Sequence, residues 1–152
     1  MENKRIVMGS DHAGYTLKQK VKEHLTARGF EVMDVGTHEN ASCNYTIYAH
    51  ELCETITSGN ADLGILICGT GIGMSMAANK HPGIRAAACE NTFSARMTRM
   101  HNDANVLCMG ERVIGYGLAC DMADLFVDTP FEGGRHQPRV DDLNRLDEAK
   151  KN

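Results

Sequence analysis

The chain has 152 residues, a formal net charge of −4 and only three prolines. A chain of this length buries a full core within one domain, so we expect a single domain over residues 1–152. The acidic balance and the absence of a basic run argue against a nucleic-acid surface, and no apolar stretch reaches the roughly 20 residues that a membrane span requires.

Five short apolar runs alternate with helix-like stretches along the chain. In order, the runs cover residues 6–8, 30–35, 63–68, 84–89 and 106–109. Each run is nearly continuous, which is typical of strands that are covered on both faces. The alternation of strand and helix predicts an α/β protein with an open parallel sheet.

The helix-like stretches carry apolar side chains at helical spacing. Glycines or a His-Pro-Gly turn follow three of these stretches and predict where they end. A fourth helix is expected over residues 92–100. The last helix, at about residues 138–150, has no strand after it, and we expect it to lie at a dimer interface.

The third apolar run leads directly into the sequence Cys-Gly-Thr-Gly-Ile-Gly at residues 68–73. This pattern predicts a thiol at the end of a buried strand, before a glycine-rich turn that opens a helix. Backbone N–H groups of such a turn suit an oxyanion or a phosphate, and their field favours the thiolate form of Cys68. Thr70 is interpreted as a helix cap whose hydroxyl can also meet a ligand.

Nucleotide-binding motifs are absent from this turn. The third glycine of a dinucleotide fingerprint would fall at Met74, although Glu90 lies about 20 residues further on, where that motif has its acid. Neither this turn nor the glycine-containing segment at residues 9–14 is followed by Gly-Lys-Ser/Thr, which excludes a P-loop. We therefore expect no cofactor.

Further polar residues follow the other predicted strands: Asp11 and His12 after the first, Glu90 and Asn91 after the fourth, and residues 110–112 after the fifth. The carboxyl ends of parallel strands meet at one edge, where α/β proteins bind ligands. Asp11 is also a common type of helix cap. The sequence thus predicts a site at this edge.

Two other segments carry candidate residues. His101 and Asn102 are interpreted as part of a polar loop after the helix at 92–100, a weak signal when taken alone. Residues 133–139 contain two glycines, Arg135 and Arg139, and predict an anion-binding loop in which guanidinium groups meet phosphate oxygens. The histidines at positions 24, 38, 50 and 81 are interpreted as structural.

The six cysteines are widely spaced, without a Cys-x-x-Cys pair or a Cys/His zinc spacing. This usage is typical of a reducing compartment. The first residues run into a strand-like segment without a signal-peptide core. We therefore expect a cytoplasmic protein without a bound metal.

Six motifs together resemble type B ribose-5-phosphate isomerase, of the ribose/galactose-6-phosphate isomerase family, over about residues 5–145. They lie at residues 10–14, 68–73, 78–80, 83–86, 101–106 and 132–136. The resemblance implies a Rossmann-like α/β/α sandwich and a homodimer or dimer of dimers with its site between subunits. It also implies metal-free interconversion of D-ribose 5-phosphate and D-ribulose 5-phosphate through an enediolate, in the pentose phosphate pathway.

The resemblance assigns roles by matching position. Cys68 resembles the base that moves the proton between C1 and C2, with Thr70 assisting. His101 resembles the acid/base that opens the sugar ring, with Asp11 nearby. The amides that stabilise the enediolate correspond to Gly69, Thr70, Gly71, Ile72 and Gly73. Contacts to the sugar or its phosphate correspond to Asp11, His12, Asn102, Arg112, Arg135 and Arg139.

One departure from the family stands before the second helix, where Asn44-Tyr45-Thr46 replaces Asp-Tyr-Pro. Three alternatives remain beside the pentose isomerase. One is an isomerase of a hexose 6-phosphate such as allose or galactose 6-phosphate, although galactose-6-phosphate isomerase subunits lack the His-Asn-Asp and Gly-Gly-Arg-His patterns. Another is a non-catalytic sugar-phosphate binding module. A thiol oxidoreductase is disfavoured because no second cysteine lies near Cys68 in the sequence.

Overall fold

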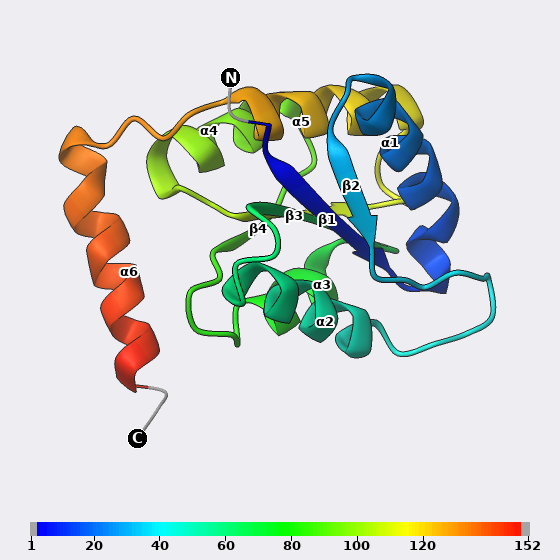
Figure 1. The fold of residues 1–152 in the computed structure, drawn as a ribbon, viewed down its shortest axis with the longest axis horizontal. Coiled ribbons are helices and arrows are strands. Elements are labelled where there is room, and N and C mark those ends of the chain that lie inside the picture. Colours follow the sequence, from blue (N-terminus) through cyan, green and yellow to red (C-terminus); the bar gives the residue numbers. More distant parts are fainter. Residues whose placement is uncertain (1–2, 150–152) are drawn as a thin grey trace.

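Five parallel strands form the central sheet of the computed structural model, which describes residues 3–149 (Figure 1). Their order across the sheet is β2-β1-β3-β5-β4. This arrangement confirms the predicted α/β class with its five-stranded parallel sheet. The strands are β1 (Arg5–Ser10), β2 (Glu31–Asp34), β3 (Leu63–Cys68), β4 (Ala86–Ala88) and β5 (Val106–Gly110).

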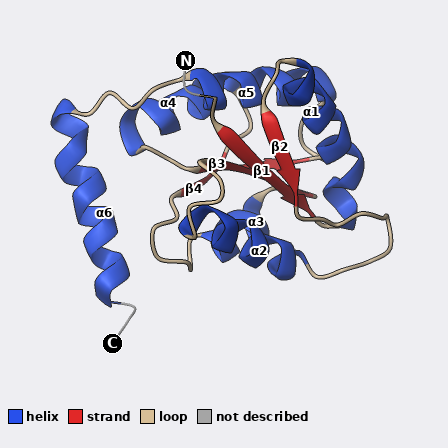
Figure 2. Ribbon diagram, viewed as in Figure 1, coloured by secondary structure: helices blue, strands red, loops and turns tan. Residues whose placement is uncertain are grey.

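Helices cover both faces of the sheet, which makes the predicted α/β/α sandwich (Figure 2). On one face lie α1 (Tyr15–Ala27), α4 (Thr92–Asn102) and α5 (Tyr116–Asp128), and on the other lie α2 (Tyr45–Thr57) and α3 (Ile72–Ala78). No helix within residues 3–149 is long and apolar enough to cross a membrane.

The central strands are apolar without interruption because alternate side chains enter two different cores. In β3, Ile65 and Ile67 pack with α1 and α5, whereas Leu66 and Cys68 pack with α2 and α3. The chain runs from β1 to β2 on one side and returns to β3 on the other. The carboxyl ends of β1 and β3 therefore flank the switch point at which open α/β sheets bind ligands.

Two predicted boundaries were wrong. The strand expected over residues 84–89 is reduced to β4, because the amide of Arg85 donates to the side chain of Asn105 (2.8 Å) rather than to a neighbouring strand. The helix expected over residues 92–100 continues to Asn102. Asp103 ends it in a left-handed conformation, where its side chain pairs with Arg99 (2.9 Å), one turn back in the helix.

A buried ion pair joins α1 to the end of β2. The Nζ atom of Lys18 lies 2.6 Å from Oδ1 of Asp34 and 2.5 Å from the carbonyl oxygen of Thr37, and the lysine side chain is fully buried. Burial lowers the pKa of Lys18. Burial alone would raise the pKa of Asp34, but hydrogen bonds from Lys18 and the Gly36 amide hold it below its usual range.

The final helix, α6 (Gln137–Ala149), lies at one side of the sandwich (Figure 1), to which the amide of Gly83 joins it by a hydrogen bond to Asp147 (2.9 Å). It follows a short 3-10 helix, η2 (Gly134–His136), and Val140 is buried at its beginning. Further along, Leu143 and Leu146 are 44% and 62% exposed. Its apolar stripe is thus largely uncovered in a single chain; Lys150, where we expected the helix to end, lies outside the described residues.

Candidate active site

Cys68 lies at the end of β3, where its side chain meets the glycine-rich loop that follows. Its Sγ atom accepts a hydrogen bond from the amide of Gly71 (3.1 Å), and the residue is only 6% exposed. Gly71 has a φ of 80°, a conformation that favours glycine. The hydroxyl of Thr70 accepts from the amide of Ile72 (3.3 Å), the first residue of α3, although the N-cap position itself is Gly71.

The loop after β5 packs closely against this turn. The amide of Glu111 donates to the carbonyl of Cys68 (2.9 Å), and the amide of Arg112 donates to that of Gly69 (3.1 Å). A Cβ atom at Gly110 would lie 2.6 Å from the Thr70 backbone, so a side chain there would displace the turn. The Arg112 guanidinium covers Gly69, since a Cβ atom at Gly69 would lie 3.3 Å from its Nη1.

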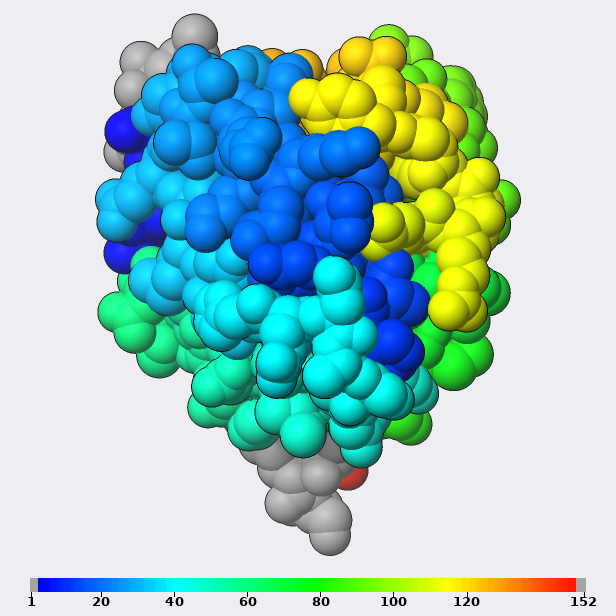
Figure 3. Space-filling view, turned by 90° about the vertical axis from the view of Figure 1, so that its right-hand side faces the viewer, coloured from blue at the N-terminus to red at the C-terminus, as the bar shows by residue number. Residues whose placement is uncertain are grey.

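The segment after β1 lies beside the same strand end. Asp11 is buried and its carboxylate accepts the amide of Gly14 (3.1 Å), so it caps the 3-10 helix η1 (His12–Gly14). A Cβ atom at Gly14 would lie 2.3 Å from the carbonyl oxygen of Ile67 in β3. The Nδ1 atom of His12 accepts from the amide of Cys43 (3.2 Å). Figure 3 shows that loop in cyan against the blue start of α1.

Tyr45 covers the far side of the glycine-rich turn, a contact that we did not predict. A Cβ atom at Gly73 would lie 2.9 Å from Cζ of its ring. Asn44 caps α2, because its side-chain oxygen accepts the amide of Thr46 (3.2 Å). The asparagine that replaces the family's aspartate therefore still supplies a capping oxygen, and the tyrosine still contacts the turn.

Two buried oxygens near this cluster have no hydrogen-bond partner within residues 3–149: Oγ of Ser10 and Oε2 of Glu111. Ser10 ends β1 and Glu111 follows β5, on either side of the end of β3. Each oxygen has lost its contact with water and gains no hydrogen bond in return, so both are candidates for contact with a polar ligand. Both residues lie in segments that the sequence places at this edge, residues 10–14 and 110–112, but nothing in the sequence singles out these two side chains.

His101 lies in a second cluster, on the last turn of α4 rather than in a loop. Its ring stacks on His136, with 4.3 Å between ring centroids. The Nε2 atom of His136 lies 3.3 Å from Oε2 of Glu132, without the alignment of a hydrogen bond. The pKa of His136 is lowered from its usual value. Burial is the largest cause, and the charges of His101, Arg135 and Arg139 add to it. Arg135 and Arg139 therefore belong to the His101 cluster.

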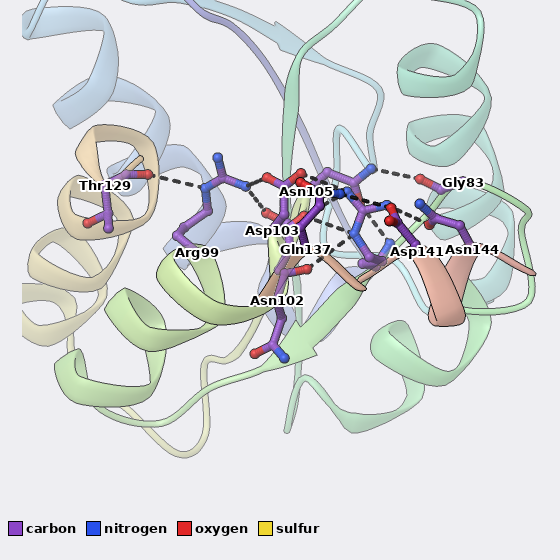
Figure 4. Close-up of polar contacts among 11 residues, drawn as sticks. Gly83, Arg99, Asn102, Asp103, Asn105, Thr129, Gln137, Asp141 and Asn144 are labelled. Atoms are coloured by element: carbon purple, nitrogen blue, oxygen red, sulfur yellow. Dashed lines mark hydrogen bonds and ion pairs between the residues drawn. The ribbon is translucent and has the colours of Figure 1, made fainter. Parts of the chain in front are cut away.

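A hydrogen-bond network holds the end of α4 in place (Figure 4). Arg99 donates to the carbonyl of Ala104 (2.6 Å) as well as to Asp103. Arg85 donates to the backbone carbonyl of Asn102 (3.2 Å) and to the side chain of Asn144 on α6 (3.1 Å). The Asn102 side chain points away from this network (Figure 4), so it is available to a ligand.

A single chain keeps the two clusters apart. Cys68 ends β3, whereas the segment that leads from α4 into β5 bonds to the beginning of β3, through the amide of Gly64 and the carbonyl of Asn105 (2.8 Å). β3 has six residues, and at roughly 3.3 Å per residue it separates the two edges by about 17 Å. His101 and Asp11 therefore do not meet within one chain, and the expectation that they lie near each other in a site between subunits stays a prediction.

Burial shifts the pKa values of four other cysteines. All six cysteines are free thiols. Burial raises the pKa of Cys53 to about 12 and also raises the pKa values of Cys89, Cys108 and Cys120. These four thiols stay protonated near neutral pH.

The comparisons with known proteins agree with this geometry. Residues 6–143 match the family model described as Ribose/Galactose Isomerase. Ribose-5-phosphate isomerase B of Escherichia coli is 44% identical over 147 residues, which cover 97% of this chain and 99% of the relative. The solved ribose-5-phosphate isomerase B of Clostridium thermocellum is 50% identical with a TM-score of 0.94, and the match covers 95% of this chain and 98% of that one.

A third relative is informative because it holds a ligand. Ribose-5-phosphate isomerase B of Mycoplasma genitalium, solved with bound ribulose 5-phosphate, is 40% identical with a TM-score of 0.90, and the match covers 95% of this chain and 96% of that one. Sequence and structure thus match the same group of isomerases over nearly the whole chain, and the resemblance inferred from the six motifs is confirmed. The chain belongs to the ribose/galactose isomerase family.

Proposed function

We propose that this chain interconverts D-ribose 5-phosphate and D-ribulose 5-phosphate, with Cys68 as the base that moves a proton between C1 and C2. The observation that carries the proposal is the position of the Cys68 sulfur at the switch point of the sheet, within 3.1 Å of the Gly71 amide. The relatives named above are ribose-5-phosphate isomerases, and the match covers nearly their whole length, which supports the same reaction.

The chemistry fits this loop. Removing a proton next to a carbonyl places negative charge on the sugar oxygen, and backbone amides that are already oriented stabilise that charge by several kcal/mol. The amides of residues 69–73 are held in place by the β5 loop and by Tyr45, so they need little rearrangement during the reaction. Thr70 assists from the same turn, and Asp11 and His12 form the wall that follows β1.

A second copy of the chain supplies the remaining groups in this proposal. His101 opens the sugar ring as acid and base, Asn102 contacts the sugar, and Arg135 and Arg139 bind the phosphate together with Arg112 and His12. Because one chain separates these groups from Cys68, two copies must meet for them to act on one substrate. A homodimer, or a dimer of dimers, satisfies this requirement.

Exposed apolar side chains support such an assembly. Ile72 and Met76 on α3 are 48% and 64% exposed, and Phe93 at the start of α4 is 66% exposed. Ile72 and Phe93 begin helices that follow β3 and β4, so they flank the edge where Cys68 lies. Contact with a second copy would remove this surface from water, and the uncovered stripe of α6 would add to the interface.

A hexose 6-phosphate is the second candidate substrate, because the matching family includes galactose isomerases and because Asn44 and Thr46 depart from the family pattern next to Tyr45. The pentose is favoured by the relatives of known name.

The six free cysteines suit a reducing compartment, and we place the enzyme in the cytoplasm on that basis.

The test is an isomerase assay on purified protein in metal-free buffer, with ribose 5-phosphate, allose 6-phosphate and galactose 6-phosphate offered in parallel. We expect the highest kcat/KM with the pentose and, in deuterated water, deuterium exchange into the substrate. Preference for a hexose would keep the reaction and change the substrate. Binding of all three sugars without turnover would reduce the protein to a binding module.

A further inference from the structure

A cluster of metal-binding side chains lies outside the proposed active site, where α2 meets the end of α3. His50 and Glu54 are four residues apart on α2 and therefore share one face of the helix, and His81 lies in the turn that follows α3. One ligand atom from each of the three residues lies within 4.8 Å of the other two. No role in the proposed reaction involves these residues.

The orientation of His81 is fixed by the backbone. Its Nδ1 atom lies 3.1 Å from the carbonyl oxygen of Ala77 and 3.2 Å from that of Ala78. A carbonyl only accepts hydrogen bonds, so Nδ1 carries the proton and Nε2 keeps its lone pair. Histidines that bind metals are usually held in this way, with the other ring nitrogen donating to a carbonyl or carboxylate.

The free nitrogen of His81 points at the second histidine. Its Nε2 atom lies 2.8 Å from Nδ1 of His50, and the two rings are tilted by 36° rather than stacked. Two nitrogens on one tetrahedral zinc lie about 3.3 Å apart, given Zn–N distances of about 2.0–2.1 Å. The exposed ring of His50 needs to move by only a few tenths of an ångström, and its proton can pass to Nε2, which leaves Nδ1 as a ligand.

We propose that His50, Glu54 and His81 form a binding site for a divalent transition metal ion of the zinc class. Two imidazole nitrogens and one carboxylate oxygen are a donor set that suits zinc, and water completes the coordination. The ion links α2 to the turn after α3. Tyr45 at the start of α2 packs on Gly73 at the start of α3, so the ion fastens the same helix pair further from the proposed active site.

The test measures Zn²⁺ binding by calorimetry and thermal unfolding, in the wild type and in the variants His50→Ala, His81→Ala and Glu54→Gln. Two variants serve as controls: His38→Ala removes an exposed histidine outside the cluster, and His101→Ala breaks the other group of possible ligands, formed by His101, Glu132 and His136. Every variant keeps all six cysteines, so any Zn²⁺ that thiols bind contributes equally to all the measurements.

We expect saturable binding in the wild type and in both controls, with a rise in Tm of about 5–10 °C at a hundredfold excess of Zn²⁺ over Kd. His50→Ala and His81→Ala should weaken this binding at least about tenfold, while activity without metal is unchanged in His50→Ala and Glu54→Gln. If His81→Ala does not fold, His50→Ala decides, because its side chain is exposed. Undiminished Zn²⁺ affinity in His50→Ala, or no saturable binding by the wild type, would overturn the proposal.

Discussion

The amide of Gly71 donates a hydrogen bond to the sulfur of Cys68 over 3.1 Å. The two residues belong to one turn, so the contact is set by the backbone itself and not by a mobile side chain. A thiolate accepts such a bond more strongly than a thiol, since hydrogen bonds to charged acceptors are the stronger ones. The turn that supplies amides to the proposed enediolate thus also orients the proposed base.

Replacing Cys68 by alanine removes the base and leaves the turn in place. We expect kcat to fall by about 10²- to 10⁴-fold, the usual contribution of a positioned acid or base, while KM changes little because the phosphate contacts remain. Steady-state kinetics with ribose 5-phosphate measure both constants. Cys120→Ala, at a buried thiol on α5, is the matched control and should keep wild-type kinetics. Undiminished turnover in Cys68→Ala would remove this residue from the mechanism.

A methyl group at Gly110 tests whether the β5 loop positions the turn. In Gly110→Ala the new Cβ atom would meet the Thr70 backbone at 2.6 Å, so the turn must move. We expect kcat/KM to drop by about 10²-fold, the loss that a displacement of about 1 Å can cause, and the free energy of unfolding to fall by about 1–3 kcal/mol.

Gly117→Ala is the control for that change. Gly117 lies in the first turn of α5 with no atom within 4 Å of an added Cβ. Alanine there should raise the free energy of unfolding by up to about 1 kcal/mol, because it restricts the unfolded chain. Activity should be unchanged. Equal kinetics in the two variants would show that close contact at Gly110 does not position the turn.

Asp34→Asn removes the charge that compensates the buried Lys18. We expect a loss of about 3–5 kcal/mol in the free energy of unfolding, because an ammonium group is left buried without its carboxylate. Asp62→Asn breaks the exposed pair between Asp62 and Arg5 and should cost at most about 1 kcal/mol. Urea unfolding, with the midpoint and slope recorded separately, distinguishes the two. Similar losses in both variants would contradict the assigned burial.

The same aspartate gives stability a defined pH dependence. The pKa of Asp34 is lower in the folded chain than in the unfolded one, so the unfolded state binds more protons between the two values. The stabilisation by Asp34 is therefore complete above the unfolded pKa of about 3.9 and is lost as the pH falls through the folded value. The difference in unfolding free energy between wild type and Asp34→Asn should shrink as the pH is lowered below about 4. A difference that stays constant would contradict this linkage.

The core of the fold could be predicted because the signal is local. The run of residues 63–68 coincides with β3, since each of its side chains is buried on one face or the other. The strand predicted at residues 84–89 was too long, because the amide of Arg85 donates its hydrogen bond to the side chain of Asn105. The buried Lys18 also carries no sequence signal, since its partners at positions 34 and 37 lie on another element.

The residues of the candidate site also fall into two groups, those with a local sequence signal and those without one. The turn at residues 68–73 is a contiguous motif, and its contact between Cys68 and Gly71 follows from the chain itself. His101 has no such local signal, and its separation from Cys68 depends on the direction in which α4 crosses the sheet. His50 and His81, interpreted as structural, are 31 positions apart in the sequence and meet only because α2 packs beside α3.

The measurement that tests the account most directly is subunit complementation between Cys68→Ala and His101→Ala. Each variant alone should be nearly inactive, because every site lacks either the proposed base or the ring-opening group. In a heterodimer of the two, one of the two sites has both residues, so co-assembled protein should regain about a quarter of wild-type activity if the copies mix at random in a symmetric dimer. Such recovery is the result we predict. A mixture no more active than its separate components would contradict a site in which Cys68 comes from one copy and His101 from the other.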